Sequence, residues 1–300
     1  FADGPDTHTV SVSIVNEDGT FAAGALDVTV NNVAPIASIA GADDVDEGSV
    51  YTLTLGDLVD PGDDTVTAAT INWGDGSSTP YTGAGDYTHT YADGLSTPTI
   101  TLEVTDEDGT FTAASKSIIV NDVAPTITLA GAAAVDEGST YTLNLSNLVD
   151  PGADTVSEYL IDWGDGSAVE SVASLGDVTH VFADGPDTHT ISVSIVNEEG
   201  TFAAGTLDVT VNNVAPTVAL SGADDVDEGA SYALTVGAIT DPGDDTVSSY
   251  TINWGDGSST TISALDLAAA GGVVNHSYAD GVSTPIITVD LVDEDGTHTT

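Results

Sequence analysis

Short runs of alternating apolar and polar residues fill most of the chain, and turns rich in Gly and Asp separate them. In Thr70-Ile71-Asn72-Trp73, this alternation predicts a strand that carries one large aromatic ring into a core. Gly74-Asp75-Gly76 then ends the strand, because the glycines permit positive φ and the Asp can hydrogen-bond the turn backbone. The segment returns at Trp163 and Trp254, which complete the set of three Trp in 300 residues. We predict that each Trp anchors the core of a small β domain.

The spacing of these motifs indicates a chain built from repeats. Trp73, Trp163 and Trp254 lie 90 and 91 residues apart. A segment of about 90 residues is large enough for a core of its own. Residues 1–36 also match residues 182–217, so we expect this sequence to be a window of a longer chain. The predicted domains are residues 1–34 (the C-terminal part of a repeat), 35–124 and 125–215 (complete repeats) and 216–300 (a repeat that lacks its last strand).

Seven short strands are predicted within residues 35–124, with almost no helical periodicity. This spacing is typical of an immunoglobulin-like β-sandwich. The predicted fold class is therefore all-β, with tandem sandwiches arranged end to end. Residues 264–272 are an exception, and for them we expect a loop with a short helical turn. The expected strands cover residues 36–40, 50–55, 66–73, a short stretch near 80, 86–91, 98–105 and 110–121.

Short linkers that contain proline join the predicted repeats. Residues 31–35 and 212–216 read Asn-Asn-Val-Ala-Pro, and residues 121–125 read Asn-Asp-Val-Ala-Pro. A short linker with Pro is stiffer than a Gly/Ser linker. We therefore expect successive repeats to follow one another with little slack.

Three features within residues 35–124 carry a family resemblance. They are the Trp-Gly-Asp-Gly-Ser turn at 73–77, the strand at 88–91 with the Ala-Asp-Gly that follows it, and Thr-Asp-Glu-Asp-Gly at 105–109. Together they resemble the polycystic-kidney-disease (PKD) domain, although the usual aromatic-Asp-Phe-Gly-Asp-Gly is Asn/Asp-Trp-Gly-Asp-Gly here. We associate this variant with repeat arrays in very large bacterial surface proteins. The resemblance implies extracellular binding or spacer modules, some of which bind calcium. The matching residues are His180, Phe182, Asp184 and 197–200 in the second repeat, and His276, Tyr278, Asp280 and 293–296 in the third.

The charge of the chain excludes several classes of partner. Forty-nine acidic residues face a single basic residue, Lys116, which gives a net charge of −48. Nucleic acid and anionic membrane surfaces are therefore excluded as partners. Only eleven of the acidic residues are Glu. An excess of Asp in Gly-rich turns fits turn chemistry and the ligation of hard cations.

Two classes of structure are excluded by composition. The chain contains no Cys, so neither disulfides nor zinc thiolates hold it together. It also has no run of about 18 apolar residues, so we expect no membrane insertion in this segment. Lys116 has no equivalent in the other repeats, and we expect no isopeptide bond there.

Acidic loops are predicted to meet where successive repeats adjoin. In a sandwich of this connectivity, alternate loops lie at opposite poles, which places Glu47, Asp75 and Asp93 opposite the loops of the next repeat. Carboxylates in contact repel one another, and salt screens them little at such short range. Six to eight oxygen ligands around Ca²⁺ would relieve the repulsion. The alternative is that these are solvated turns in which each Asp satisfies its own backbone.

We therefore predict Ca²⁺ as the cofactor, bound at one or more junctions between domains. The candidate ligands come from the linkers, from the loop that precedes each Trp strand, and from the acidic loop near the end of each repeat. They are Asn31, Asn32, Asp60, Asp63, Asp64, Asp106, Asp108, Asn121, Asp122, Asp150, Asp154, Asn197, Glu199, Asn212, Asn213, Asp241, Asp244, Asp245, Asp293 and Asp295.

The histidines are predicted to pack rather than to bind metal. His89, His180 and His276 each lie two residues before an aromatic residue on the same strand. We therefore expect them to lie on the sheet. His8, His189 and His298 are expected at the surface.

The predicted function is structural. The chain reads as a segment of a long extracellular repeat protein, an adhesin stalk or surface fibre, made rigid by calcium at its junctions. Its expected partners are neighbouring repeats of the same chain, with other copies in a fibre as a further candidate. The alternative is an accessory module of a secreted enzyme that binds carbohydrate or protein, which would need an exposed aromatic platform. We expect no enzyme activity, because no pair of carboxylates differs from its equivalents in the other repeats.

Overall fold

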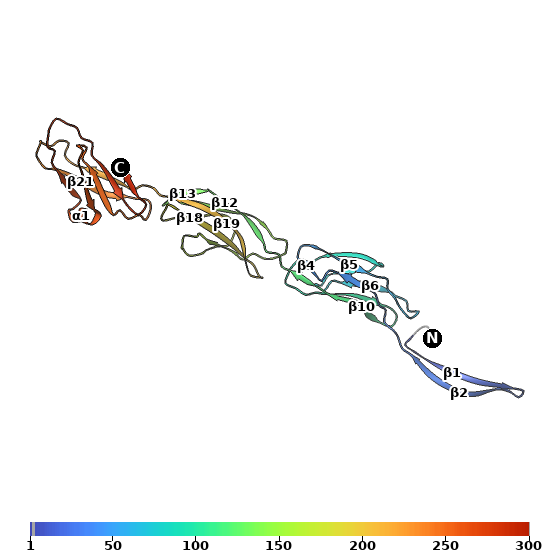
Figure 1. Ribbon diagram of the computed structural model, residues 1–300. Helices are drawn as coiled ribbons and strands as arrows, with labels where there is room; N and C mark the ends of the chain where they lie inside the picture. Colours follow the sequence, from blue (N-terminus) through green and yellow to red (C-terminus); the bar gives the residue numbers. More distant parts are fainter. Residues whose placement is uncertain (2–3, 300) are drawn as a thin grey trace. The chain divides into compact units, whose positions relative to one another are not determined.

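The computed structural model describes residue 1 and residues 4–299, and nearly all of its regular structure is β-strand (Figure 1). The strands form immunoglobulin-like β-sandwiches, as the alternating pattern predicts. At the N-terminus, β1 (Asp6–Asn16) and β2 (Gly19–Val30) form an antiparallel hairpin with a bulge between Val12 and Ser13. Its apolar side chains are exposed, with Val12 at 58% and Ile14 at 59%.

Residues 35–124 form two facing sheets around one core. The core contains Leu53 and Leu55 from one sheet and Ile71 and Leu102 from the other, all buried. A parallel pair, β4 (Asp44–Asp46) with β11 (Ile119–Asn121), closes one side. The first sheet consists of β3 (Ile39–Gly41), β5 (Val50–Leu55) and β8 (Gly85–Thr90), and the second of β10 (Thr110–Ser117), β9 (Thr99–Thr105), β6 (Ala68–Asn72) and β7 (Ser78–Pro80).

Residues 125–215 repeat this arrangement around a second core. The parallel pair is now β13 (Ala134–Asp136) with β19 (Thr201–Asn212), and β19 continues into the sheet without a break. The remaining strands of this sheet are β18 (Asp187–Val196), β15 (Glu158–Asp162) and β16 (Glu170–Val172), and the facing sheet consists of β12 (Thr126–Gly131), β14 (Thr140–Val149) and β17 (Gly176–Val181).

Residues 216–299 hold a third core. The short helix α1 (Ala264–Ala269) lies within the segment that was predicted to contain a helical turn, and the Ser263 side chain caps it by accepting from the N–H of Asp266. One sheet consists of β20 (Thr217–Ser221), β21 (Tyr232–Thr240) and β24 (Val273–His276), and the other of β23 (Ser259–Ser263), β22 (Ser249–Asn253), β25 (Thr288–Val292) and β26 (Thr297–Thr299).

Each core is built around its Trp. Trp73 and Trp163 are 1% exposed and Trp254 is 0% exposed. A buried indole N–H needs an acceptor. Trp73 donates to Thr79 Oγ1 at 2.9 Å, and the two other indoles have acceptors at equivalent positions. The predicted role of the three Trp as core anchors is confirmed.

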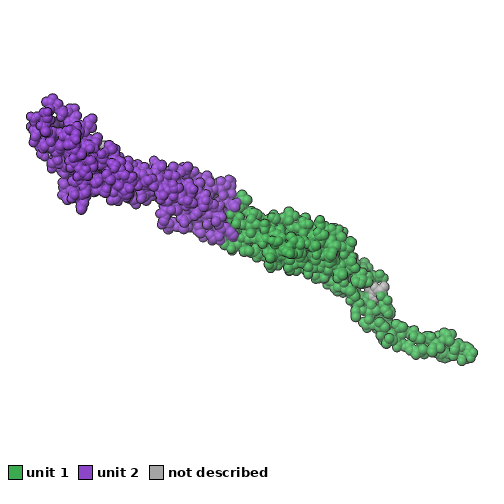
Figure 2. Space-filling view, in the orientation of Figure 1, with its two compact units in different colours: residues 1–125, 149–155, 197–200 green, residues 126–148, 156–196, 201–300 purple. Residues whose placement is uncertain are grey.

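The chain divides into two compact units (Figure 2). Unit 1 contains residues 1–125 together with the short segments 149–155 and 197–200, and unit 2 contains the remaining residues from 126 to 300. The segments 149–155 and 197–200 thus group with residues 1–125, although their sequence lies inside the second predicted repeat. The domain boundaries given above stay a prediction.

Candidate metal centres

A tight turn after β4 buries one carboxylate completely. The backbone N–H of Glu47 donates to Asn121 O at 3.0 Å, and that of Gly48, with φ of 67°, donates to Tyr91 O at 2.8 Å. These bonds fix the turn against β11 and the end of β8. Glu47 is 0% exposed, and its Oε1 accepts from the N–H of Val123 at 2.8 Å. Its Oε2 is buried beside Gly94 and makes no hydrogen bond of regular geometry with the described residues.

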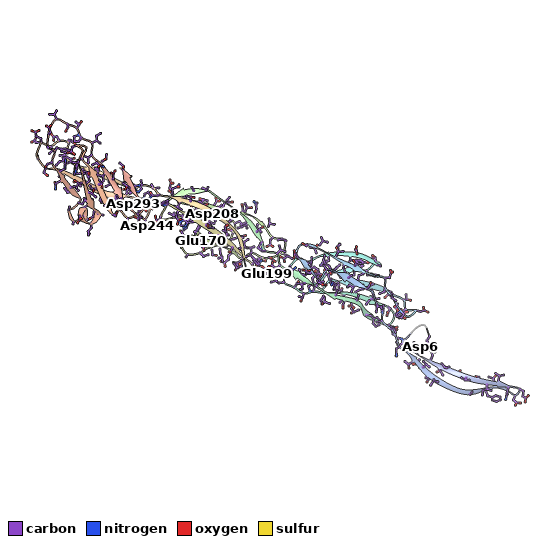
Figure 3. The ribbon with its side chains drawn as sticks, viewed as in Figure 1. Asp6, Glu170, Glu199, Asp208, Asp244 and Asp293 are labelled. Atoms are coloured by element: carbon purple, nitrogen blue, oxygen red, sulfur yellow. The ribbon has the colours of Figure 1, made fainter. Side chains whose placement is uncertain are left out.

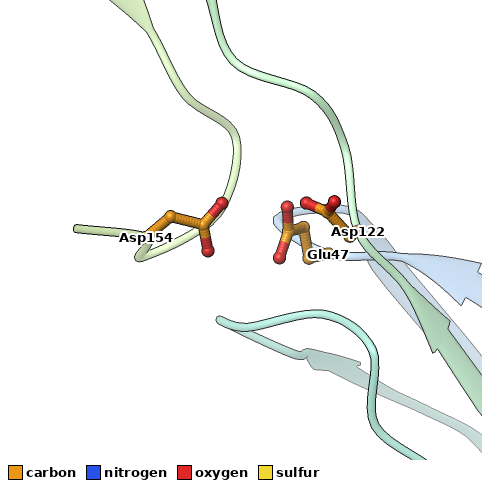
Figure 4. A group of neighbouring side chains, drawn as sticks. All are labelled: Glu47, Asp122 and Asp154. Carbon is orange, nitrogen blue, oxygen red and sulfur yellow. The ribbon is translucent and has the colours of Figure 1, made fainter. Parts of the chain in front are cut away.

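Further carboxylates gather around Glu47 within unit 1. Glu47, Asp122 and Asp154 each offer an oxygen, and these oxygens lie within 4.8 Å of one another. Figure 4 shows the three side chains facing one another. Asp154 also belongs to a second group of the same size, with Asp93 and Glu199. We call these five residues, together with the neighbouring Asp150, the Glu47 site.

The loop that carries Asp150 and Asp154 is held in place by backbone bonds. The N–H of Ala153 donates to Ala92 O at 2.7 Å, and the N–H of Thr155 donates to Glu198 Oε2 at 2.7 Å. The approach is so close that a Cβ at Gly152 would lie 2.6 Å from Glu47 Cδ. A Cβ at Gly48 would overlap the carbonyl oxygen of Pro151. Glycine at these two positions therefore lets the acidic loop pack directly on the buried carboxylate.

The electrostatics of the Glu47 site are unbalanced. Burial raises the pKa of Glu47, and the charges of Asp154 and Asp122 raise it further, whereas the backbone N–H groups of Val123 and, more weakly, Gly94 oppose the shift. Burial and neighbouring carboxylates also raise the pKa values of Asp150 and Asp154. No Lys or Arg belongs to the site. The buried oxygens that receive no hydrogen bond from the described residues are Glu47 Oε2, Asp122 Oδ1, Asp150 Oδ2, Asp154 Oδ1 and Glu199 Oε2.

Unit 2 contains an equivalent arrangement around Glu137, which is also 0% exposed. Its two carboxylate oxygens accept from the N–H groups of Val214 and Gly185, each at 2.7 Å. The N–H of Asp244 donates to Ala183 O at 2.8 Å, as Ala153 does to Ala92. The two acidic groups here are Glu137, Asp241 and Asp245, and Asp184, Asp245 and Asp295.

Asp245 shows the strongest effect of this crowding. Burial, followed by the charges of Glu137, Asp241, Asp295 and Asp184, raises the pKa of Asp245 to about 7. Both of its carboxylate oxygens are buried without a hydrogen bond from the described residues. We call the five residues of these two groups, with Asp293, the Glu137 site. Glu199 of the first site and Asp293 of the second are labelled in Figure 3.

A third group in unit 1 joins Asp60, Asp64 and Asp106. Asp106 is 6% exposed, and its Oδ1 accepts from the N–H groups of Asp108 and Gly109. Its Oδ2 is buried without a hydrogen bond from the described residues. Asp60 and Asp64 occupy the positions that Asp150 and Asp154 occupy in the next repeat.

The structure brings nine of the predicted ligands into acidic groups: Asp60, Asp64, Asp106, Asp122, Asp154, Glu199, Asp241, Asp245 and Asp295. Asp150 and Asp293 lie next to such groups in the chain, while Asp108 donates its N–H to Asp106. Asn197 donates its side-chain N–H to Asp154, and Asn213 donates to Asp295.

Other predicted ligands lie elsewhere. Asn121 donates to the exposed Asp46, and Asn212 donates to Asp136, because both asparagines end the strands of the parallel pairs. Asp63 and Asp244 join no acidic group among the described residues, and the backbone of Asn31 and Asn32 lies against Gly4.

Four members of the acidic groups were not among the predicted ligands: Glu47, Asp93, Glu137 and Asp184. Sequence reasoning places Glu47 and Asp93 at the facing pole without assigning them to a metal. The recurring Val-Asp-Glu-Gly motif marks both glutamates in the sequence, but it does not separate them from the exposed Glu228 of the third repeat.

The turn aspartates are paired with histidines. His89 stacks on Trp73 with ring centroids 4.8 Å apart, and its Nε2 lies 2.7 Å from Asp75 Oδ2. His180 and His276 repeat both contacts. The predicted packing of these three histidines is confirmed. The expected surface position of His8, His189 and His298 holds only in part, because each is half-buried. His8 stacks on Phe1, His189 stacks on Phe182, and His298 contacts Asp293.

No family model matches the sequence, and no curated protein matches it. The chain is similar to solved fibronectin(III)-like modules of Clostridium thermocellum CbhA, with 16% identity, a TM-score of 0.26, and coverage of 59% of this chain and 93% of that one. It is also similar to domains A168–A170 of titin, with 12% identity, a TM-score of 0.36, and coverage of 89% and 98%. Within the described part of the chain, no helix is long and apolar enough to cross a membrane.

Proposed function

We propose that this chain is a structural segment of a long extracellular repeat protein, an adhesin stalk or surface fibre, in which calcium makes adjoining repeats rigid. The observation that carries the proposal is the buried glutamate at each site. Glu47 and Glu137 are fully buried, and each lies in a group with carboxylates from an acidic loop of the next repeat in sequence. A buried carboxylate surrounded by carboxylates is costly unless a cation balances it.

The donor set fits Ca²⁺. Every member of the acidic groups is a carboxylate, and Ca²⁺ binds oxygen ligands at about 2.3–2.6 Å. Two ligands on opposite sides of one ion are therefore about 5 Å apart, and the oxygens of each group lie within 4.8 Å. None of these groups contains His, and the chain has no Cys, so the site lacks the softer ligands that zinc prefers.

The ligands of one ion at the Glu47 site would come from two successive repeats, and this would make their junction rigid. Glu47 and Asp122 belong to residues 35–124, whereas Asp154 belongs to residues 125–215. An ion bound by all three ties these segments together. We propose PKD-type domains, with neighbouring repeats as partners and an extracellular location, where millimolar calcium would keep weak sites filled.

A carbohydrate-binding role lacks a platform in this chain. The large aromatic residues with high exposure in the described part are Phe1 at 74% and Phe21 at 52%, both in the N-terminal segment. Most Tyr and all Trp side chains lie in or against the cores. We propose no catalytic role, since the buried carboxylates are explained by a structural cation.

Thermal unfolding of the full chain in calcium and in a chelator, at matched ionic strength, tests the proposal. Ions that bind only the folded state stabilise it by about 2.7 kcal/mol at a concentration 100-fold above Kd. We expect calcium to raise the melting temperature and magnesium to raise it less, because Mg²⁺ requires a tighter octahedral site. Coinciding melting curves in calcium and chelator would overturn the calcium role.

A further inference from the structure

We propose that the Glu47 site and the Glu137 site each bind a pair of Ca²⁺ ions, bridged by Asp154 in the first and by Asp245 in the second. This inference rests on the proposed function and specifies the number of ions and the ligands of each one.

The geometry of the acidic groups requires two positions. At the Glu47 site, Asp154 belongs both to the group with Glu47 and Asp122 and to the group with Asp93 and Glu199. The oxygens within each group lie within 4.8 Å of one another, but the five residues do not form a single group of that size. One Ca²⁺ reaches oxygens up to about 5 Å apart, so one ion serves one group. Asp154 has two oxygens, and a carboxylate can bridge two ions.

Both groups that share Asp154 contain buried oxygens without a hydrogen bond from the described residues. In the first group, Glu47 is 0% exposed, and both its Oε2 and Asp122 Oδ1 are buried without a regular hydrogen bond from the described residues. In the second group, Glu199 Oε2 is buried and equally unpaired. A buried polar atom without a partner points to a ligand that the protein does not itself supply. We therefore assign one ion to the carboxylate oxygens of each group.

The same bridge occurs independently in unit 2. Asp245 joins the group with Glu137 and Asp241 to the group with Asp184 and Asp295. Both oxygens of Asp245 are buried without a hydrogen bond from the described residues, which leaves one for each ion.

The two sites also have the same number of carboxylates, although these do not all stand at equivalent positions. Where the Glu47 site has Asp122, the other has Asn213, and where the Glu47 site has Asn197, the other has Asp293. One Ca²⁺ would leave four negative charges at each site, and two would leave two. The six carboxylates are Glu47, Asp93, Asp122, Asp150, Asp154 and Glu199 in the first site, and Glu137, Asp184, Asp241, Asp245, Asp293 and Asp295 in the second.

Counting ions on variants of the full chain tests the bridge. The probe is calcium alone, measured by native mass spectrometry and by equilibrium dialysis with metal analysis. We expect Asp93→Asn to lose one ion and Asp154→Asn to lose two, relative to the unsubstituted chain. Asp57→Asn is the control of equal charge, because Asp57 is exposed and joins no acidic group among the described residues; it should lose none.

The outcomes separate the two proposals. If Asp93→Asn and Asp154→Asn each lose the same single ion, the bridge is overturned while the calcium role stands. If Asp93→Asn loses none, the second position is overturned. If the unsubstituted chain binds no calcium at millimolar concentration, both proposals fall. Asp93 is exposed, so its variant keeps the fold, and Trp fluorescence checks this for both variants.

Discussion

The turn at residues 45–48 and the turn at residues 226–229 share the sequence Val-Asp-Glu-Gly but differ in their surroundings. Glu47 is 0% exposed, whereas Glu228 is exposed. Locally the turns agree: Gly48 has φ of 67° and Gly229 has φ of 72°. Each glutamate also accepts one backbone N–H bond, Glu228 from Gly281 at 3.0 Å.

The difference lies in what packs on each turn. A Cβ added to Gly48 would overlap the backbone of Pro151, whereas a Cβ on Gly229 would meet nothing within 4 Å in the described structure. The turn sequence therefore sets the conformation of the glutamate, and the acidic loop of the next repeat buries it. Four predictions test this separation of local from tertiary effects.

The largest difference is expected between Gly48→Ala and Gly229→Ala. Both substitutions place a Cβ in the left-handed region, at about 1–2 kcal/mol. Gly48→Ala also forces the loop at Pro151 away, which adds about 1–3 kcal/mol. Urea-induced unfolding of the two variants in calcium measures the difference. Equal losses would show that the loop contributes nothing at Glu47.

Next in size is the calcium response of Glu47→Gln against Glu228→Gln. Loss of the buried ligand should weaken calcium binding about 100-fold, or about 2.7 kcal/mol, and Glu228→Gln should leave it unchanged. In chelator, Glu47→Gln should instead increase the free energy of unfolding above that of the unsubstituted chain. The substitution removes a buried charge that has no cation beside it. Calcium titrations and melting curves of both variants check this. A destabilised Glu47→Gln variant in chelator would contradict it.

Much of the fold could be predicted from the sequence. The Trp anchors, the sandwich class and the helical turn at 264–269 follow from alternation and turn residues, which are local signals. The parallel pair β4 with β11 could not, because three residues are too few to show a period and their partner is over 70 residues away. Residues 110–121 were therefore expected as one strand, but β10 ends at Ser117 and β11 begins at Ile119.

The candidate sites were predictable in part. Acidic turns at opposite poles place Asp122 and Asp154 near each other, since loop order follows from the topology. The burial of Glu47 could not be predicted from its turn, because it depends on the packing of residues 150–154, over 100 residues further along the chain. That packing depends on backbone contacts such as the N–H of Ala153 with Ala92 O.

A smaller effect is expected from pH in the absence of calcium. The pKa of Asp245 is raised to about 7, so the folded chain binds a proton there that the unfolded chain releases near pH 4. The contribution of Asp245 to the free energy of unfolding should therefore be greatest below pH 4 and should decline as the pH rises to about 7. We expect a loss of about 2 kcal/mol, because water partly screens the charges.

Melting curves in chelator between pH 5 and 8 measure this decline. Asp245→Asn should flatten it, and Glu228→Gln, at the exposed turn, should not. Calcium should abolish the decline, since the ion keeps the carboxylate deprotonated. The prediction would be contradicted if stability in chelator rose with pH and Asp245→Asn left this rise unchanged. Other groups would then have to neutralise the buried carboxylates.

The smallest effect is expected when one carboxylate of the Glu47 site is moved to the position that it has in the Glu137 site. Asp122→Asn alone should weaken calcium binding at the Glu47 site about tenfold, or about 1.4 kcal/mol. Adding Asn197→Asp should restore it to within about threefold, because the pair then matches Asn213 and Asp293 of the other site. The new carboxylate fits: Asn197 Oδ1 accepts from the N–H groups at 199 and 200, and Asp293 Oδ1 accepts from the equivalent pair at 295 and 296. Calcium titrations of the single and double variants decide the point. If the double variant binds as weakly as Asp122→Asn, the position of each ligand matters, and the equal count of six carboxylates does not explain how the two sites balance their ions.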